Sequence, residues 1–157
     1  MEAPTGEAII SFLLPTIDMA ALLPGSLILV TGASGHIGSH VVNEALLAGY
    51  RVRGTARTRE KCDQTERYFH HDDYPCAEVG DFSREGAFDE AMLACDAVIH
   101  VASKMSFGCN PHKVVTPVVA GTEAILRSAG RQASVKRFVL IIRLLLAPCW
   151  LRAWMRR

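Results

Sequence analysis

The chain has 157 residues, a length that suits one domain with its own hydrophobic core. Half of its residues are apolar and 21% are charged, which excludes an intrinsically disordered chain. The formal net charge of +1 gives no reason to expect nucleic acid or an anionic membrane as a partner.

Short apolar runs alternate with amphipathic stretches over most of the chain. The predicted strands are Leu27–Val30, Arg51–Ala56, Cys76–Val79, Ala97–Ala102 and Arg137–Ile142. The predicted helices are His36–Ala48, a charged and irregular Thr58–Tyr68, Ser83–Leu93 and His112–Ala129. Strands and helices that alternate at this spacing predict an α/β fold with a doubly wound parallel sheet and right-handed crossovers.

The segments at the two ends of the chain differ from this pattern. Residues 1–26 contain three prolines and no hydrophobic period, so we expect a leader before the domain 27–142. Residues 143–157 hold four arginines and no acid, and form a short apolar and basic tail. Since no apolar stretch reaches the ~18–20 residues of a membrane span and the first basic residue is Arg51, we expect a soluble, cytoplasmic protein.

Cysteine spacing gives no sign of a metal site. The five cysteines are widely spaced without a CxxC pair, and His70 and His71 are adjacent rather than one helical turn apart. We therefore expect no metal, and free thiols in a reducing compartment.

A glycine-rich segment, Thr31–Gly38, lies between the first predicted strand and the first predicted helix. Gly32 would make the sharp exit from the strand, Gly35 would let the backbone approach a pyrophosphate, and Gly38 would let the helix pack closely. Free N–H groups and the positive end of the helix would face the phosphates. The alternative is a turn selected only for tightness. The candidate cofactor-binding residues here are Gly32, Ser34, Gly35, His36, Ile37 and Gly38.

The GxxGxxG spacing resembles that of extended short-chain dehydrogenases/reductases, the NAD-dependent epimerase/dehydratase superfamily. Its dihydroflavonol-reductase-like fungal aldehyde and ketone reductases are the most similar group. The stretches that carry this resemblance are Gly49–Arg57, Gly80–Phe82, Ala87–Ala91, Ala97–Ser103, Ala120–Thr122 and Val135–Leu140. The resemblance runs from Leu23 to Leu140 and covers only the N-terminal half of such an enzyme. It implies a Rossmann-type sheet, truncated after about the fifth strand. The alternation of strands and helices, with the rule that ligands bind where the strand order reverses, predicts the order 3-2-1-4-5.

The end of the second predicted strand predicts the choice of cofactor. NAD-binding relatives of this fold place an acid there for the ribose 2′-hydroxyl, whereas this strand ends at Arg57 and the next acid is Glu60. A guanidinium binds a phosphate in a bidentate manner, which favours NADP(H). The resemblance implies Arg57 as the main 2′-phosphate ligand, assisted by Lys61. The alternative is solvated strand-end charge, which we prefer for the neighbouring basic residues Arg51, Arg53 and Arg59.

Two further groups of candidate cofactor-binding residues follow the third and fourth predicted strands. The resemblance implies that Asp81 receives the adenine amino group and that Phe82 covers the ring. The alternative, compatible with this role, is that Asp81 or Ser83 caps the following helix. Val101, Ala102 and Ser103 are expected to line the cofactor where the strand order reverses, and His100 is expected to be a core histidine.

The residues that perform catalysis in the resembled enzymes are missing. Those enzymes use a serine and a tyrosine with a lysine four residues later. The residues four positions after Tyr50, Tyr68 and Tyr74 are Gly54, Asp72 and Glu78. The family likeness also ends at Leu140, before the serine.

Two functions remain open. The first is the NADP(H)-binding portion of a carbonyl reductase, whose carbonyl substrate binds only in a longer form of the protein. The second is a non-catalytic NADP(H)-binding regulatory module. A third, an NAD-retaining epimerase or dehydratase, is disfavoured by the basic end of the second strand. The expected partner is thus a small-molecule nucleotide, not nucleic acid or a membrane.

Overall fold

Five short strands form one parallel sheet in the order β3-β2-β1-β4-β5, as predicted. The computed structural model describes residues 22–103 and 111–141, so most of the expected leader and the whole of the tail lie outside the described residues. The strands are β1 (Leu27–Thr31), β2 (Arg51–Ala56), β3 (Cys76–Glu78), β4 (Ala97–His100) and β5 (Arg137–Leu140). The helices are α2 (His36–Leu47), α3 (Arg59–Phe69) and α4 (Pro111–Arg131).

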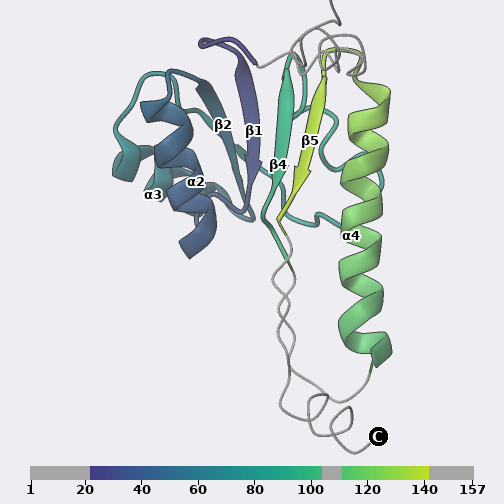
Figure 1. The fold of residues 1–157 in the computed structure, drawn as a ribbon. Coiled ribbons are helices and arrows are strands. Elements are labelled where there is room, and N and C mark those ends of the chain that lie inside the picture. The colour runs from purple at the N-terminus through teal and green to yellow at the C-terminus, as the bar shows by residue number, and fades with distance from the viewer. Residues whose placement is uncertain (1–21, 104–110, 142–157) are drawn as a thin grey trace, which may run out of the picture.

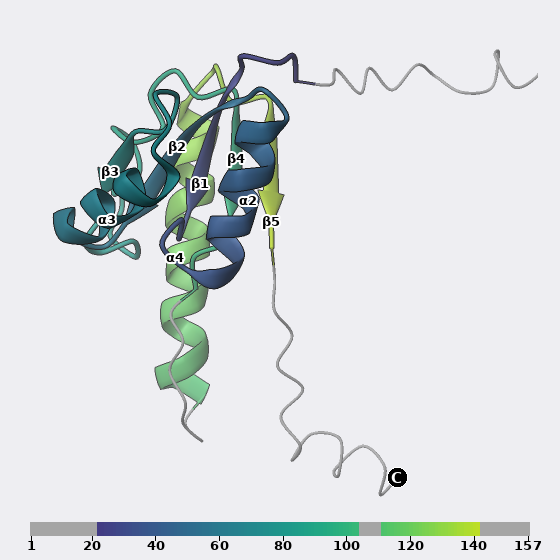
Figure 2. The same ribbon diagram turned by 90° about the vertical axis from the view of Figure 1, so that its left-hand side faces the viewer.

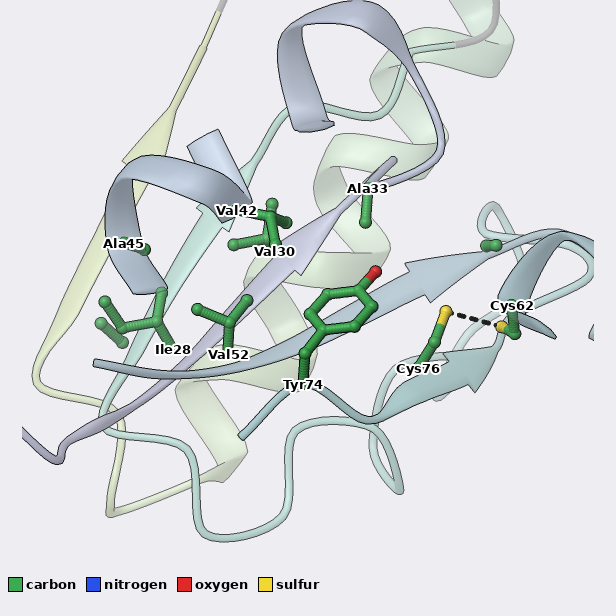
Figure 3. Close-up of a cluster of buried hydrophobic side chains, with 11 residues drawn as sticks. Ile28, Val30, Ala33, Val42, Ala45, Val52, Cys62, Tyr74 and Cys76 are labelled. Carbon is green, nitrogen blue, oxygen red and sulfur yellow. Dashed lines mark hydrogen bonds between the residues drawn. The ribbon is translucent and has the colours of Figure 1, made fainter. Parts of the chain in front are cut away.

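Helices cover both faces of the sheet. Figures 1 and 2 show α2 and α3 on one face and α4 on the other. The side chains of β1 alternate between these faces, since successive residues of a strand point in opposite directions. Ile28 and Val30 pack with Val42 of α2 in one buried cluster, which Figure 3 shows. Leu27 and Leu29 belong to a second cluster on the α4 face. A central strand buried on both faces explains its uninterrupted apolar run.

The structure corrects the prediction that α3 is irregular. Thr58 caps its N-terminus by accepting a hydrogen bond from the backbone N–H of Lys61 at 3.3 Å, and the helix runs regularly for 11 residues. His70 ends it in the left-handed conformation, with φ of 45°. Arg59 donates to Asp63 one turn later at 2.6 Å. Caps and ion pairs therefore support a helix whose composition alone argued against regularity.

The predicted helix Ser83–Leu93 is wrong, because this segment is a series of turns. Gly86 has φ of +73°, a left-handed conformation that interrupts a helix. The backbone bonds on either side mostly span three residues, as from the N–H of Ala87 to the carbonyl of Arg84. Phe88 and Met92 are nevertheless buried. The apolar residues whose spacing predicted a helix are therefore part of the core, although their backbone forms turns.

The helix α4 is longer than the predicted His112–Ala129, and its 21 residues include Pro117 in the second turn. The strand β5 follows it at the edge of the sheet. Within the described part of the chain, no helix combines the length and apolarity needed to cross a membrane.

Candidate functional site

The carboxyl ends of the parallel strands meet at one edge of the sheet, and the predicted site residues follow them. Gly32 follows β1, Arg57 follows β2, Asp81 follows β3 after two residues, and Val101 follows β4. Neighbouring strands bring these loops together: a Cβ added at Gly32 would lie 3.1 Å from the backbone of Ala102. The structure thus gathers at one edge residues that are up to 71 positions apart.

The glycines after β1 perform the packing tasks predicted for them. Gly32 has φ of +68°, which turns the chain sharply out of the strand. A Cβ on Gly38 would lie 2.7 Å from the carbonyl carbon of Gly32, so only glycine lets α2 approach this turn so closely. The N–H of Gly35 closes the turn on the carbonyl of Gly32 at 2.9 Å. A side chain on Gly35 would begin 3.3 Å from that same oxygen and cover the turn.

The N-terminus of α2 is exposed at this turn. The helix begins at His36, and its cap residue Gly35 supplies no side-chain hydrogen bond. Ser34, Gly35, His36 and Ile37 are all exposed, whereas Gly38 is buried. The first N–H groups of a helix have no carbonyl partner within it and carry partial positive charge. An anion of the size of a phosphate can therefore accept hydrogen bonds here.

A buried hydroxyl holds the ends of β1 and β4 together below the glycine turn. Thr31 Oγ1 accepts hydrogen bonds from the backbone N–H groups of Val101 and Ala102, both at 3.1 Å. The same oxygen lies 2.7 Å from Nδ1 of His100. Because a hydroxyl has two acceptor positions and one proton, that proton is donated to Nδ1. His100 is therefore neutral with its own proton on Nε2, and its burial lowers the pKa of the ring.

Two of the neighbouring arginines have structural roles rather than being solvated charges as predicted. The guanidinium of Arg53 donates to the carbonyl oxygens of Ala91 at 2.9 Å and Leu93 at 2.8 Å. It thereby supports the series of turns 83–93, which packs on the same face of the sheet as α4. Arg59 pairs with Asp63 within α3 and donates to the carbonyl of Cys76 at 3.2 Å. Both guanidinium groups thus have partners within the described residues, although the Arg59 side chain stays 55% exposed.

The remaining basic residues separate into one paired and two unpaired side chains. Arg51 lies 3.7 Å from Asp73 in an exposed ion pair at the start of β2, where solvated charge was predicted. Arg57 and Lys61 are exposed, and within residues 22–103 and 111–141 neither side chain has a hydrogen-bond or ion-pair partner. Among the basic residues from β2 to the first turn of α3, the two that were predicted to bind a phosphate are thus the two that the described structure leaves unpaired.

A shallow hollow of about 290 Å³ lies between the glycine turn and α3. It brings the predicted residues Ser34 and Lys61 to the same surface, whereas Arg57 lies outside its lining. The full lining is Ala33, Ser34, Ser39, Lys61, Gln64, Thr65, Tyr68 and Phe69. Sequence reasoning missed Gln64 and Tyr68, although their spacing of three and seven residues from Lys61 places them on the same helical face.

The residues after β3 are held by local contacts. The Asp81 carboxylate accepts hydrogen bonds from the N–H of Ser83 at 3.0 Å and from its hydroxyl at 2.6 Å. The alternative of a helix cap does not hold, because no helix follows, and Asp81 instead closes a turn with Ser83. The ring of Phe82 lies against Gly121 of α4, where an added Cβ would collide with the ring edge. The aromatic side chain that the resemblance assigns to the adenine is thus packed against α4.

The three tyrosines lie in different surroundings. Tyr50 donates its hydroxyl to the carbonyl of Leu22 at 3.0 Å, and Tyr68 is 77% exposed on α3. Tyr74 is buried, its hydroxyl has no hydrogen-bond partner among the described residues, and burial raises its pKa well above the usual value. A tyrosine that donates a proton to an alkoxide needs the opposite shift.

The expectation of no metal overlooked one pair of histidines. His36 and His40 are one turn apart on α2, and their ring centroids lie 5.1 Å apart in an edge-to-face arrangement. Two histidines at this spacing can share a metal ion, but a site needs at least a third ligand. Within the described residues, no third histidine, cysteine or carboxylate joins them.

Comparisons with known proteins agree with this arrangement. Aldehyde reductase 2 of Sporidiobolus salmonicolor is 44% identical over 127 residues, which are 79% of this chain and 37% of that protein. Dihydroflavonol 4-reductase of Hordeum vulgare is 36% identical over 120 residues, or 71% of this chain and 33% of that one. The crystal structure of yeast methylglyoxal/isovaleraldehyde reductase Gre2, complexed with NADPH, has a TM-score of 0.67 and 32% identity. The match to Gre2 covers 73% of this chain and 36% of the other.

The chain therefore spans about a third of the length of the curated relatives that it matches. Residues 28–141 match the NAD dependent epimerase/dehydratase family. This range includes the glycine turn and the ends of β2, β3 and β4, which together build the site. On these grounds, the chain belongs to the NAD dependent epimerase/dehydratase family.

Proposed function

We propose that the chain is the NADP(H)-binding portion of a carbonyl reductase-like oxidoreductase. One observation carries the proposal: Lys61 lines the hollow beside an exposed helix N-terminus at a glycine turn, Arg57 directly follows the neighbouring strand β2, and the described structure leaves both side chains unpaired. A helix N-terminus suits a pyrophosphate, and unpaired cations at the end of β2 suit a 2′-phosphate.

The residues present fit such a nucleotide. The turn at Gly35 carries no side chain over the exposed N–H groups of His36 and Ile37, which would donate to the pyrophosphate. Arg57 and Lys61 would hold the 2′-phosphate by charge-assisted hydrogen bonds. Asp81 and Phe82 would contact the adenine, and Val101, Ala102 and Ser103 would line the inner part of the site. NADPH, when bound, supplies a hydride for the reduction of a carbonyl carbon.

The relatives support the reductase part of this proposal. Aldehyde reductase 2 and dihydroflavonol 4-reductase are named as reductases, and the yeast structure is complexed with NADPH. Since the chain covers about a third of their length, we assign the carbonyl substrate to a longer form that supplies the remaining parts of the site.

A second candidate is a non-catalytic NADP(H)-binding module. The sequence has no tyrosine followed four residues later by lysine, and Tyr74 is held as a buried, protonated phenol. Both candidates predict the same nucleotide binding and differ only in whether reduction follows.

The test is a fluorescence titration of the full chain with NADPH and NADH. We expect tighter binding of NADPH, and we expect Arg57→Ala to remove most of the difference. A hydrogen bond to a charged group contributes about 1.5–3 kcal/mol, so the loss in NADPH affinity is roughly tenfold or more.

Arg51→Ala is the matched control, because Arg51 lies at the other end of the same strand and pairs with Asp73. This variant is expected to keep the preference for NADPH. Equal affinities of the parent chain for the two nucleotides would refute the proposed cofactor.

A further inference from the structure

Two cysteines that are 14 residues apart in the sequence are in contact. The Sγ atoms of Cys62, on α3, and Cys76, on β3, lie 2.7 Å apart. Figure 3 shows the two thiols pointing toward each other between the helix and the strand. Cys62 is fully buried and Cys76 is 6% exposed. Sulfur atoms this close need little movement of the backbone to reach bonding distance.

Few buried side chains hold α3 on the sheet. Its buried residues are Cys62 and Thr65, and most of the other positions are charged or polar and exposed. Partly buried Phe69 adds a contact with the core, and the backbone of Cys76 accepts a hydrogen bond from Arg59 at 3.2 Å and donates one to Glu66 at 2.9 Å. The ion pairs of Arg59 with Asp63 and Glu66 lie within the helix and on its surface, so they do not add to this attachment. An element with so little buried apolar surface opens locally at a lower free energy than the core strands.

The closed arrangement protects the thiols from oxidants. Burial raises the pKa of the Cys76 thiol to about 12, so it stays protonated at neutral pH. Because thiolates rather than thiols react with oxidants, Cys76 reacts when α3 opens and water reaches its sulfur atom. Closure then returns the two sulfur atoms to contact.

From this geometry we propose that Cys62 and Cys76 are a site of reversible disulfide formation that clamps α3 to β3. The two thiols lose two electrons and two protons, and one S–S bond forms. A hydroperoxide accepts these electrons and protons as its O–O bond breaks, leaving an alcohol and one water. A diazene accepts them at its N=N bond and becomes a hydrazine.

The clamp adjoins the nucleotide site, and this second part of the inference rests on the proposed function. Lys61 immediately precedes Cys62 and lines the hollow beside the glycine turn. A 2′-phosphate held by Lys61 stabilises the closed position of α3, and a ligand that binds only the closed state lowers the open population. Bound NADP⁺ therefore slows disulfide formation.

The first experiment oxidises the reduced full chain with diamide, a diazene, and then alkylates the remaining thiols. Trypsin cleaves after Lys61, Arg67 and Arg84, so Cys62 and Cys76 lie in separate peptides, 62–67 and 68–84. We expect these two peptides to be recovered joined and 2 Da lighter than their sum, and to separate on reduction. The joined chain should also unfold at a higher temperature than the reduced chain.

Two serine variants provide the matched comparison. Cys76→Ser removes one partner and should abolish the joined peptide. Cys95→Ser changes another fully buried thiol, whose hydrogen bonds among the described residues are with carbonyl oxygens and Arg53, and should leave the yield unchanged. Either of two results would overturn the disulfide site. One is recovery of both peptides only in alkylated form, and the other is the same mixture of disulfide pairings from the native chain and from the urea-unfolded chain.

The second experiment measures the rate of joining with nucleotide present. NADP⁺ at ten times its Kd should slow the reaction up to about tenfold, and NAD⁺ at the same multiple of its own Kd should slow it less. Equal rates with and without bound NADP⁺ would overturn the coupling to the nucleotide. A chain that binds no NADP⁺ would refute the proposed function, while the disulfide is judged by the first experiment alone.

Discussion

The Thr31 hydroxyl is fully buried and forms three hydrogen bonds, so one side chain sets the tautomer of His100 and the position of the loop after β4. Burial lowers the pKa of His100, which means that the unfolded chain binds a proton more readily than the folded chain does. The contribution of this residue to stability is therefore complete above the ordinary pKa of about 6.5 and is lost as the pH falls below it.

We predict that the free energy of unfolding falls by at most about 1.4 kcal/mol per pH unit between pH 6.5 and the folded pKa of His100. His100→Asn keeps an acceptor near Nδ1 but does not titrate, so this variant should lose that part of the pH dependence. Urea unfolding of the parent chain and of the variant at pH 7.5 and pH 5.5 measures how the free energy of unfolding of each changes with pH. Identical slopes for the parent chain and the variant would show that His100 is not the titrating group.

Between elements, the contact of Phe82 with Gly121 joins the loop after β3 to α4. A Cβ on Gly121 would collide with the ring of Phe82, whereas one on Gly130 of the same helix would meet nothing within 4 Å. Alanine in place of Gly130 therefore tests helix propensity alone, whereas alanine in place of Gly121 also tests packing against Phe82.

We predict that Gly121→Ala lowers the free energy of unfolding by about 1–3 kcal/mol, because an extra methyl group in a packed contact forces a shift. Gly130→Ala should raise it by up to about 1 kcal/mol, since alanine favours the helix. Phe82→Leu should reduce the loss caused by Gly121→Ala in a double-mutant cycle measured by urea unfolding. Stabilisation by both alanines would mean that the contact does not constrain α4.

For the whole molecule, the sequence has no tyrosine followed four residues later by lysine to serve the proposed nucleotide site. The strand β5 also lies at the edge of the sheet, and its residues Val139 and Leu140 are 47% and 39% exposed. An open strand edge with exposed apolar side chains favours association with other chains.

We predict that residues 1–157 bind NADPH without reducing aldehydes or ketones at ordinary enzyme rates. General acid catalysis typically contributes 10²–10⁴-fold, and positioning of the substrate contributes further. NADPH consumption with several carbonyl compounds measures this, with aldehyde reductase 2 assayed under the same conditions as the positive control. Turnover by a monodisperse monomer would show that another group supplies the proton.

The order of the strands was predictable from the sequence because local patterns determine it. Apolar runs specify buried strands, and parallel strands joined by right-handed crossovers leave few possible orders. The turn after β1 was predictable for a similar reason, because the conformational freedom of Gly32 acts within a few residues of the chain. The candidate phosphate ligands could also be named, Arg57 from its place directly after β2 together with the resemblance, and Lys61 from the resemblance alone.

Only the tertiary structure decided which of these charges are unpaired and which distant groups meet. Arg53 looked like its neighbours in the sequence, yet its partners are carbonyl groups 38 and 40 residues away. The same holds for the contact of Cys62 with Cys76 and for the Phe82 ring that lies on Gly121. Propensity and periodicity describe how a residue relates to the next few positions. These contacts instead depend on how helices and turns pack on the sheet, and that packing forms only when the whole chain has folded.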